Sequence, residues 1–72
     1  MTFNEAAQLS MKQGHCPFHC GYGEWMRVSI TGVIVKADPY TTWDGGGEPF
    51  PVEAHMLFSN EFDLYSPEKY PL

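Results

Sequence analysis

The segment HCPFHCGYGEWMRV, from His15 to Val28, decides how the rest of this chain is interpreted. It holds both cysteines, two of the three histidines and the only arginine of a 72-residue sequence. One interpretation is a metal site, and the other is a strand, a tight turn and a second strand that together hold a small ligand. We favour the second, because Gly21 and Gly23 permit the positive φ angles that a tight turn uses.

The metal interpretation uses four residues of this segment: His15, Cys16, His19 and Cys20. All four side-chain types can bind zinc, but a structural zinc site usually draws on two separated pairs of ligands. Adjacent side chains of an extended chain point to opposite faces, and Pro17 argues against a helix here. We therefore expect no native metal and keep zinc as the weaker alternative, in which His55 would supply a distant ligand.

Acidic residues outnumber basic ones by nine to four, which gives a formal charge of −5. A protein that binds nucleic acid polymers needs clustered lysine and arginine, so this balance argues against that class. No apolar run is long enough to cross a bilayer, and the sequence does not start like a signal peptide. We therefore expect a cytoplasmic protein whose cysteines stay reduced, with neither membranes nor nucleic acid polymers as partners.

The first residues have the pattern of a helix. Thr2 is a good N-cap and Glu5 follows three residues later, which makes a capping box. Apolar residues then recur on one face at helical spacing, and Gly14 supplies a left-handed C-terminal residue. We expect a helix over residues 2–13 that covers one face of a sheet.

The strands of this sheet are expected between residues 15 and 65. Pro17 lacks a backbone donor, so the chain from His15 to His19 is predicted as an edge strand, a bulge or a loop rather than a central strand. The alternating run WMRVSITGVIVK, Trp25 to Lys36, is predicted as the main strand. Gly32 within it marks a bulge or begins a hairpin bend.

Residues 37–51 are predicted as a loop, because they include three prolines and three consecutive glycines. Alternation predicts a strand over Val52 to Ser59 and a short final strand over Phe62 to Tyr65, followed by an extended tail at 66–72. The sequence therefore predicts one α+β domain over 1–72, a short N-terminal helix packed on a small antiparallel β-sheet. So small a domain is marginal alone, and we expect a homo-oligomer, a dimer or a tetramer.

The chain lacks the patterns of common catalytic sites. A cysteine and a histidine that are adjacent on a strand do not place a nucleophile against its base. The nine acids show no recognisable pairing, and GGGEP at 45–49 lacks the lysine and hydroxyl residue of a phosphate-binding loop. We therefore expect a protein that is not an enzyme and uses no cofactor.

Five short motifs follow one another along the chain: MTFNEA at 1–6, KQG at 12–14, GY at 21–22, WMRV at 25–28 and SNEFDL at 59–64. Their order and spacing resemble small phage proteins of the second Thoeris anti-defence family. That family opens with a short helix ending in lysine-glycine, continues with a strand, a glycine-tryptophan turn and another strand, and closes on a segment like Ser-x-Asp-Trp-Glu-Val. The resemblance covers about half of the chain. The basic residues that usually follow Gly14 in the family are replaced here by His15, Cys16, Phe18 and His19.

The resemblance implies a phage sponge, a small helix-plus-sheet protein that binds a cyclic nucleotide immune signal and holds it without cleaving it. The signal would be a cyclic ADP-ribose isomer or a cyclic oligonucleotide. Members of that family assemble into homo-oligomers, typically tetramers, with ligands bound between subunits. An alternative of a different class is an acidic inhibitor that binds a host defence protein directly.

A sponge needs a stacking surface, a cation for phosphate and a few fixed polar groups. The candidate ligand-binding residues are Tyr22, Trp25 and Trp43 for stacking, Arg27 for phosphate, and Ser29, Thr31 and Asn60 for ribose or base edges. Tyr22 takes the place of the turn tryptophan that stacks on a base in the family, which is a role implied by the resemblance. Arg27 is chosen because its planar guanidinium makes bidentate contacts with phosphate. Trp25 is equally consistent with a core position, and Arg27 with a solvent-facing strand position.

Overall fold

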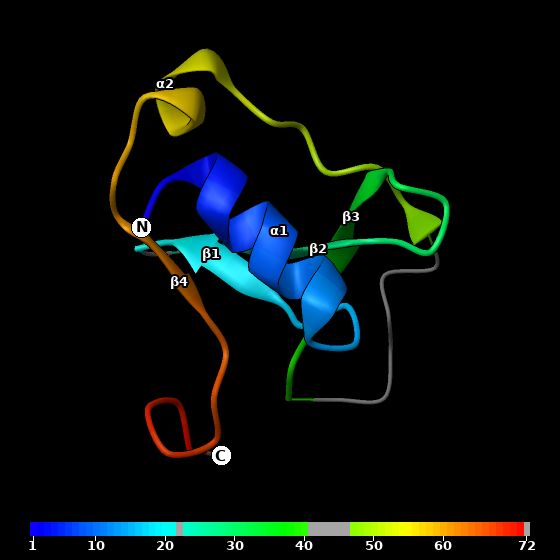
Figure 1. The fold of residues 1–72 in the computed structure, drawn as a ribbon, viewed down its shortest axis with the longest axis vertical. Coiled ribbons are helices and arrows are strands. Elements are labelled where there is room, and N and C mark those ends of the chain that lie inside the picture. The colour runs from blue at the N-terminus through cyan, green and yellow to red at the C-terminus, as the bar shows by residue number, and fades with distance from the viewer. Residues whose placement is uncertain (22, 41–46, 72) are drawn as a thin grey trace.

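A computed structural model of the chain describes residues 1–21, 23–40 and 47–71. The elements are, in order, α1 (Phe3–Lys12), β1 (Phe18–Cys20), β2 (Trp25–Val28), β3 (Ile34–Ala37), α2 (Ala54–Leu57) and β4 (Phe62–Leu64). The four strands form one antiparallel sheet in the order β3-β2-β1-β4, and α1 lies across one face of it (Figure 1). The predicted α+β class, a short N-terminal helix on a small antiparallel sheet, is confirmed.

Helix α1 begins where the capping box predicts. The Glu5 backbone N–H donates to Thr2 Oγ1 at 3.2 Å, and the Thr2 backbone N–H donates to Glu5 Oε1 at 2.9 Å. This hydrogen bond from the Thr2 backbone holds the pKa of the Glu5 carboxyl below its usual value. The helix ends at Lys12, and Gly14 follows with a φ of 69° that glycine adopts without strain.

The core lies between α1 and the sheet. Its buried members are Ala6, Phe18, Cys20, Met26, Val28, Phe50 and Phe62. Alternation on the strands explains this set, because every second side chain of β1, β2 and β4 faces the helix. Phe18 and Met26 lose all of their solvent exposure, and Phe3 of the helix meets Phe62 edge to face with ring centroids 5.5 Å apart. Aromatic and sulfur-containing side chains thus fill a core too small for many residues.

Ser10 is the polar member of this interface, and it is fully buried on α1. Its hydroxyl donates to the Cys16 carbonyl oxygen at 2.7 Å and accepts from the Val28 backbone N–H at 3.4 Å. One serine therefore fixes the helix both to β2 and to the connection that leads into β1.

The prediction of an edge strand, bulge or loop for His15 to His19 is wrong for Phe18 and His19, although His15 to Pro17 do form a connection outside the strands. Strand β1 is central, because Phe18 pairs with Met26 of β2 on one side and with Leu64 of β4 on the other. Pro17 does not interrupt the ladder because it directly precedes the strand and contributes only its carbonyl oxygen, which accepts from the Tyr65 backbone N–H at 2.9 Å.

The single long strand predicted from Trp25 to Lys36 is also wrong, whereas its alternative, a hairpin bend near Gly32, is confirmed. Strand β2 ends at Val28, and the Ser29 backbone N–H donates to the Val33 carbonyl oxygen at 2.8 Å across the turn. Gly32 has a φ of 85°, so the turn uses a conformation that favours glycine. The alternation of residue types that predicted the long strand continues through the turn, so alternation alone did not indicate where β2 ends.

Residues 48–50 of the predicted loop run beside β3. The Lys36 backbone N–H donates to the Glu48 carbonyl oxygen at 2.9 Å, and the Phe50 N–H donates to the Ile34 carbonyl oxygen at 3.0 Å. Phe50 thereby enters the core. The outer edge of β3 is already paired, and the strand predicted for Val52 to Ser59 does not form.

The structure has the short helix α2 in place of that predicted strand. Met56 faces the core from α2, while Leu57 and Phe58 are exposed at 55% and 87%. The alternation that predicted a strand reflected two contacts with the core, from Val52 and Met56, rather than a row of side chains in a sheet.

The final predicted strand is confirmed as β4, but the predicted extended tail folds back. A turn follows β4, in which the Tyr70 backbone N–H donates to the Ser66 carbonyl oxygen at 2.9 Å. On the outer side of β4, Phe62 exchanges backbone hydrogen bonds with Met1, at 2.9 and 3.0 Å. Among the described residues, no helix is long and apolar enough to cross a membrane.

Candidate functional site

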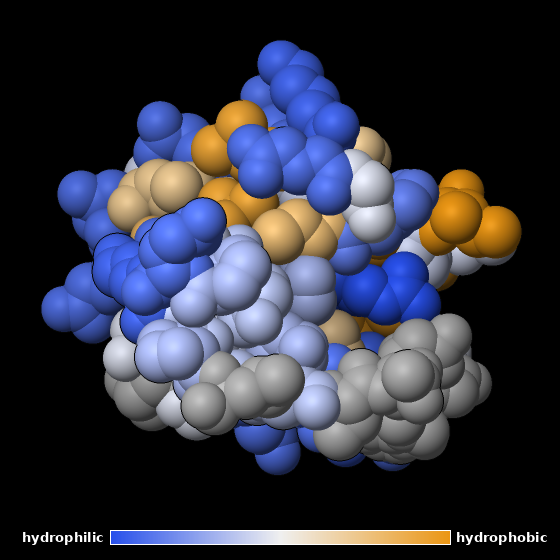
Figure 2. Space-filling model, turned by 90° about the horizontal axis from the view of Figure 1, so that it is seen from below, coloured by the Kyte–Doolittle hydropathy of each residue, from blue (hydrophilic) through white to orange (hydrophobic). Residues whose placement is uncertain are grey.

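The sheet face that looks away from α1 carries a cluster of rings. We call it the aromatic face, and its members are His19, Trp25, Tyr40, Tyr65 and Tyr70. Strand alternation creates it, because Trp25 and His19 occupy positions between the core residues of β2 and β1. Seen from the side of the C-terminal turn, mildly hydrophilic side chains gather at the centre of the surface, between strongly hydrophilic ones on either side and hydrophobic ones above (Figure 2).

Trp25 is the centre of this cluster. Its ring centroid lies 4.2 Å from that of His19, 5.1 Å from Tyr70, 5.8 Å from Tyr65 and 6.4 Å from Tyr40. The three tyrosine rings stand within 9° of perpendicular to the indole, which is the edge-to-face arrangement that aromatic quadrupoles favour. The indole remains half-buried, so the cluster is a surface feature and not a second core.

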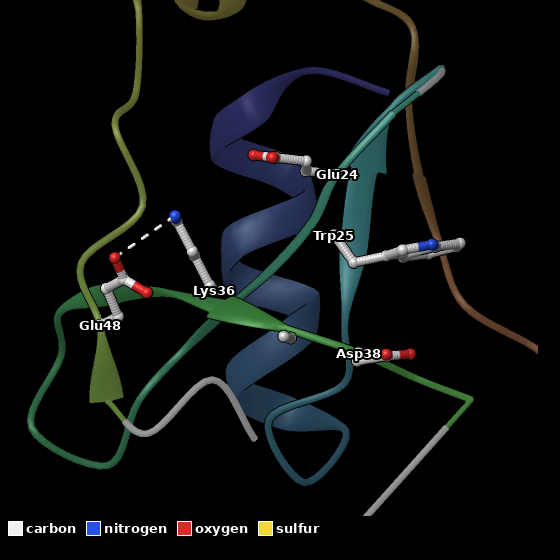
Figure 3. Close-up of a pocket in the computed structure, with 6 residues that line it drawn as sticks. Glu24, Trp25, Lys36, Asp38 and Glu48 are labelled. Carbon is white, nitrogen blue, oxygen red and sulfur yellow. Dashed lines mark hydrogen bonds and ion pairs between the residues drawn. The ribbon is translucent and has the colours of Figure 1, made fainter. Parts of the chain in front are cut away.

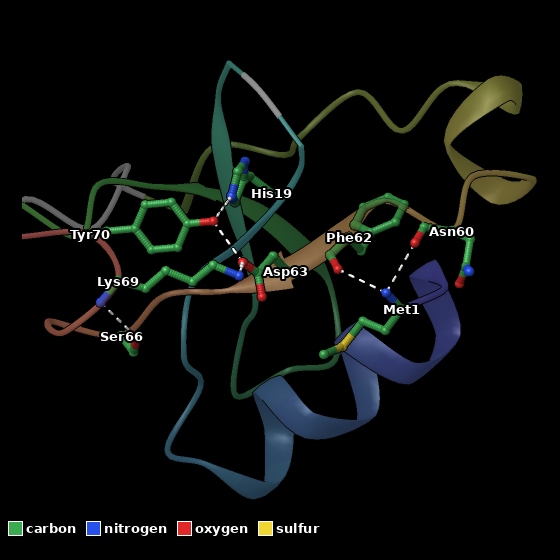
Figure 4. A network of polar contacts seen from close by, with 8 residues as sticks. All are labelled: Met1, His19, Asn60, Phe62, Asp63, Ser66, Lys69 and Tyr70. Atoms are coloured by element: carbon green, nitrogen blue, oxygen red, sulfur yellow. Dashed lines mark hydrogen bonds and ion pairs between the residues drawn. The ribbon is translucent and has the colours of Figure 1, made fainter.

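A chain of polar contacts attaches the tail to this face (Figure 4). The Tyr70 hydroxyl donates to Asp63 Oδ2 at 2.7 Å, and its oxygen lies 2.8 Å from His19 Nε2. Since the single hydroxyl proton goes to Asp63, His19 Nε2 is the donor in the second contact. Lys69 forms an ion pair with the same carboxylate. We call the set of Asp63, His19, Tyr70 and Lys69 the tail latch.

The latch shifts the pKa values of its members in directions that its geometry explains. The hydrogen bond from Lys69 and that from Tyr70 hold the pKa of the Asp63 carboxyl below its usual value. The hydrogen bond to that carboxylate raises the pKa of Tyr70 to about 12. Burial lowers the pKa of His19, because desolvation disfavours the imidazolium. Near neutral pH the latch therefore joins a neutral imidazole, a phenol and a paired carboxylate.

A hollow of about 380 Å³ adjoins Trp25. Its lining residues are Glu24, Trp25, Lys36, Ala37, Asp38 and Glu48. Trp25 and Asp38 point to one side of the strands, whereas Glu24, Lys36 and Glu48 point to the other (Figure 3). Lys36 Nζ lies 3.4 Å from Glu48 Oε1. On the side of Trp25 the hollow carries the Asp38 carboxylate, and on the other side it carries Glu24, Glu48 and the paired ammonium of Lys36.

The structure brings two of the predicted ligand-binding residues onto one face. Trp25 and Arg27 are two positions apart on β2, both half-buried and both on the side away from the helix. Ser29 and Thr31 lie instead in the turn after β2, where their hydroxyl oxygens are 2.9 Å apart. Asn60 is exposed ahead of β4, and its carbonyl oxygen accepts from the Met1 amino group at 3.1 Å. Tyr22 and Trp43 lie outside the described residues.

The four residues of the zinc alternative point in different directions. His15 Nδ1 contacts the Val28 carbonyl oxygen at 2.7 Å, and His19 belongs to the tail latch. Cys16 Sγ lies 3.4 Å from the Tyr65 carbonyl oxygen, while Cys20 faces the core with Sγ 3.4 Å from Ser59 Oγ. Both thiols are free, and burial raises the pKa of Cys16. No three His, Cys, Asp or Glu side chains within residues 1–21, 23–40 and 47–71 are grouped to hold a metal ion.

Tyr65 and Tyr70 were not predicted from the sequence as site residues, and His19 was considered only as a zinc ligand. Alternation through β4 gives a signal for one of them, because it places Tyr65 on the same side as Asp63. The sequence offers no comparable signal for Tyr70, which reaches the face only because the tail turns back.

Comparison with known protein families gives no match, and searches of curated proteins and of solved structures find no significantly similar protein or fold.

Proposed function

We propose that this chain is a phage-encoded anti-defence protein that binds a cyclic nucleotide immune signal and sequesters it without cleaving it, as a homo-oligomer in the host cytoplasm. The observation that supports this proposal most is the common placement of Trp25 and Arg27 on one face of β2. An aromatic ring and a guanidinium are the two groups that a nucleotide-binding surface needs first. The motifs at the two ends of the chain and the glycine-tyrosine turn supply the second line of support.

The spacing of these two residues suits a nucleotide. Two positions along a strand separate their Cα atoms by about 7 Å, which is comparable with the distance from a base to its phosphate. A base that stacks on Trp25 would therefore place a phosphate near Arg27. Carboxylates beside the indole, such as Asp38, would accept hydrogen bonds from ribose hydroxyls or an exocyclic amine.

The charge of the surface narrows the choice of signal. Lys36 is paired with Glu48 and Lys69 with Asp63, so these two ammonium groups already neutralise carboxylates. A ligand with two phosphates costs less electrostatic repulsion at such a surface than one with three. We therefore favour a cyclic ADP-ribose isomer over a cyclic trinucleotide. A two-fold interface between subunits would bring a second Arg27 to the ligand.

A second candidate function has its own observation. Leu57 and Phe58 at the end of α2 are exposed at 55% and 87%, and Glu53 and Glu61 on either side of them are exposed too. Exposed apolar side chains bordered by charge are typical of protein–protein contact surfaces. This surface supports the alternative in which the chain inhibits a host defence protein by direct binding.

Native mass spectrometry of the purified protein separates the two functions. We expect a homo-oligomer that gains the mass of an intact ligand when mixed with cyclic ADP-ribose isomers, and a smaller bound fraction with cyclic trinucleotides; cyclic dinucleotides complete the panel. Heating should release the nucleotide unchanged. A protein that binds none of these compounds and instead captures one host protein, with capture lost in Phe58→Ser, would support direct inhibition.

The Arg27→Ala variant tests the proposed site. We expect it to lose most nucleotide affinity, by at least about tenfold, while the oligomer persists, because a charge-assisted contact with phosphate is removed. Lys12→Ala is the matched control, since it removes one positive charge from an exposed position on α1, away from the aromatic face. Unchanged affinity in Arg27→Ala, or equal losses in the two variants, would remove Arg27 from the site.

A further inference from the structure

Resting on the proposed function, we propose that the ring bound at Trp25 is a positively charged one, such as an N-alkylated pyridinium or an N1-alkylated adenine. The positive charge would lie on the base of the ligand, which binds at Trp25, and not near its phosphates. Three aromatic rings and one carboxylate around this position favour a cation.

The rings of Tyr40 and Tyr65 both stand roughly perpendicular to the indole of Trp25. We call the indole the floor, the two tyrosine rings the walls, and the space between the three rings the corner. The planes of both tyrosines are nearly perpendicular to the indole, at 87° and 81°, and they are perpendicular to one another within 3°. The three centroids are 5.8 to 6.4 Å apart. A flat ring that stacks on the indole would present its edge to both tyrosine rings.

The edge of a cationic ring suits these walls better than the edge of a neutral one. The faces of tyrosine and tryptophan carry negative electrostatic potential, and they attract a cation within about 6 Å of the ring centroid. With perpendicular rings at the observed spacing, a group in the corner that they form would be about 4 Å from each centroid, well within that range. N-alkyl carbons and ring C–H groups carry the positive charge of a pyridinium at this edge.

Asp38 places a formal negative charge at the same corner. It follows Ala37, which pairs with Trp25 in the sheet, and its side chain points to the same side of the strands as the indole (Figure 3). Its Oδ1 accepts from the Tyr40 backbone N–H at 2.9 Å, so the carboxylate also positions one wall. The nearby ammonium of Lys69 is paired with Asp63 and offsets little of this negative potential.

Tyr40 is 41% exposed, so its ring is accessible from solvent. The tail latch also contacts the indole, with the ring centroids of His19 and Tyr70 at 4.2 and 5.1 Å from that of Trp25. Such a partly exposed site gives a cation–π preference of moderate size, on the order of tenfold in affinity.

Two pairs of small probes isolate the effect of charge. 1-Methylnicotinamide is a cation and nicotinamide is its neutral counterpart, and 1-methyladenosine and adenosine differ in the same way near pH 7. Binding is measured by calorimetry on the native sequence, with quenching of tryptophan fluorescence as a second readout. We expect each cation to bind about tenfold more tightly than its neutral partner.

Three variants test which residues cause the preference for the cationic probes. Tyr40→Leu removes one of the three rings and should reduce the preference, and Asp38→Asn should reduce it to about threefold. Glu53→Gln is the control, because it removes one negative charge at an exposed position ahead of α2, and it should leave the ratio unchanged. Equal affinity for cation and neutral probe, or equal effects of Asp38→Asn and Glu53→Gln, would overturn the inference.

The probes carry no phosphate, so the preference for a cationic ring can be present or absent independently of the binding of cyclic nucleotides. Binding of cyclic nucleotides without any preference for the cationic probes would overturn the inference and leave the sponge in place. A tenfold preference for the cations in a protein that binds no cyclic nucleotide would support the ring site and overturn the sponge.

Discussion

The two faces of the sheet are held together in different ways. Toward α1, side chains such as Phe18 and Met26 are fully buried and meet apolar neighbours, as hydrophobic packing requires. On the aromatic face, half-buried rings meet edge to face, and polar contacts join His19 to Tyr70 across 51 residues of sequence. The difference indicates that the helix face supplies most of the stability, whereas the rings of the aromatic face remain partly exposed.

Phe18→Ala, on the sheet face that packs against α1, should destabilise the protein more than any other change considered. Removing a fully buried ring from the centre of β1 should lower the free energy of unfolding by about 3–5 kcal/mol, since a cavity replaces contacts with both α1 and β4. That loss is close to the whole stability of a small domain, so we expect a largely unfolded protein. Urea unfolding followed by circular dichroism measures it.

The control for this change is Ile30→Ala, because Ile30 is 86% exposed in the turn after β2. It should alter stability by less than about 0.5 kcal/mol. Similar losses in the two variants would contradict the view that burial against α1 dominates the stability of this fold.

Tyr70→Phe tests the tail latch with a smaller effect. The variant keeps the ring and removes the hydroxyl that donates to Asp63 and accepts from His19. We expect a loss of about 1 kcal/mol and faster amide exchange in the turn after β4. A double-mutant cycle with His19→Gln measures the coupling, and strictly additive losses would show that the two side chains do not act together.

The pH dependence of stability should show the smallest effect. Burial lowers the pKa of His19, so the folded state resists a proton that the unfolded chain binds near the ordinary pKa of 6.5. Stability is therefore fully present above that value and falls as the pH drops below it, until the folded-state pKa is passed. The lowered pKa of Asp63 adds a separate loss at more acidic pH, below its ordinary 3.8.

Thermal unfolding between neutral pH and about pH 5 measures the contribution of the histidine. The midpoint should decline across this window in the native sequence and decline less in His19→Gln. An equal decline in both proteins would assign the effect to other groups and leave the latch without a role in it.

Local signals in the sequence predicted the parts of the fold that local chemistry determines. The capping box at Thr2 and Glu5 located α1, and the alternation around Phe62 located β4. The hairpin after Val28 was predicted only as an alternative, from Gly32, and the helix α2 was missed, because alternation alone cannot distinguish a strand from a turn or a short helix that makes the same contacts.

Within the candidate site, Trp25 and Arg27 were selected from the sequence as candidate ligand-binding residues, because aromatic and guanidinium groups suggest a ligand by their chemistry alone. Tyr70 and His19 were not placed together, because their contact depends on a turn in the tail and on the central position of β1. Long-range pairing of this kind is decided by tertiary packing and leaves no periodic pattern in the chain.

Both outermost strands of the sheet already have backbone partners along part of their length, with residues 48–50 beside β3 and Met1 beside Phe62 of β4. Outer strands with free backbone groups act as templates that recruit strands of other chains and start aggregation. The coverage of these two edges, together with the formal charge of −5, makes this chain a poor seed for fibril growth at high concentration. Copies that associate will therefore meet through their side chains rather than through a continuous sheet.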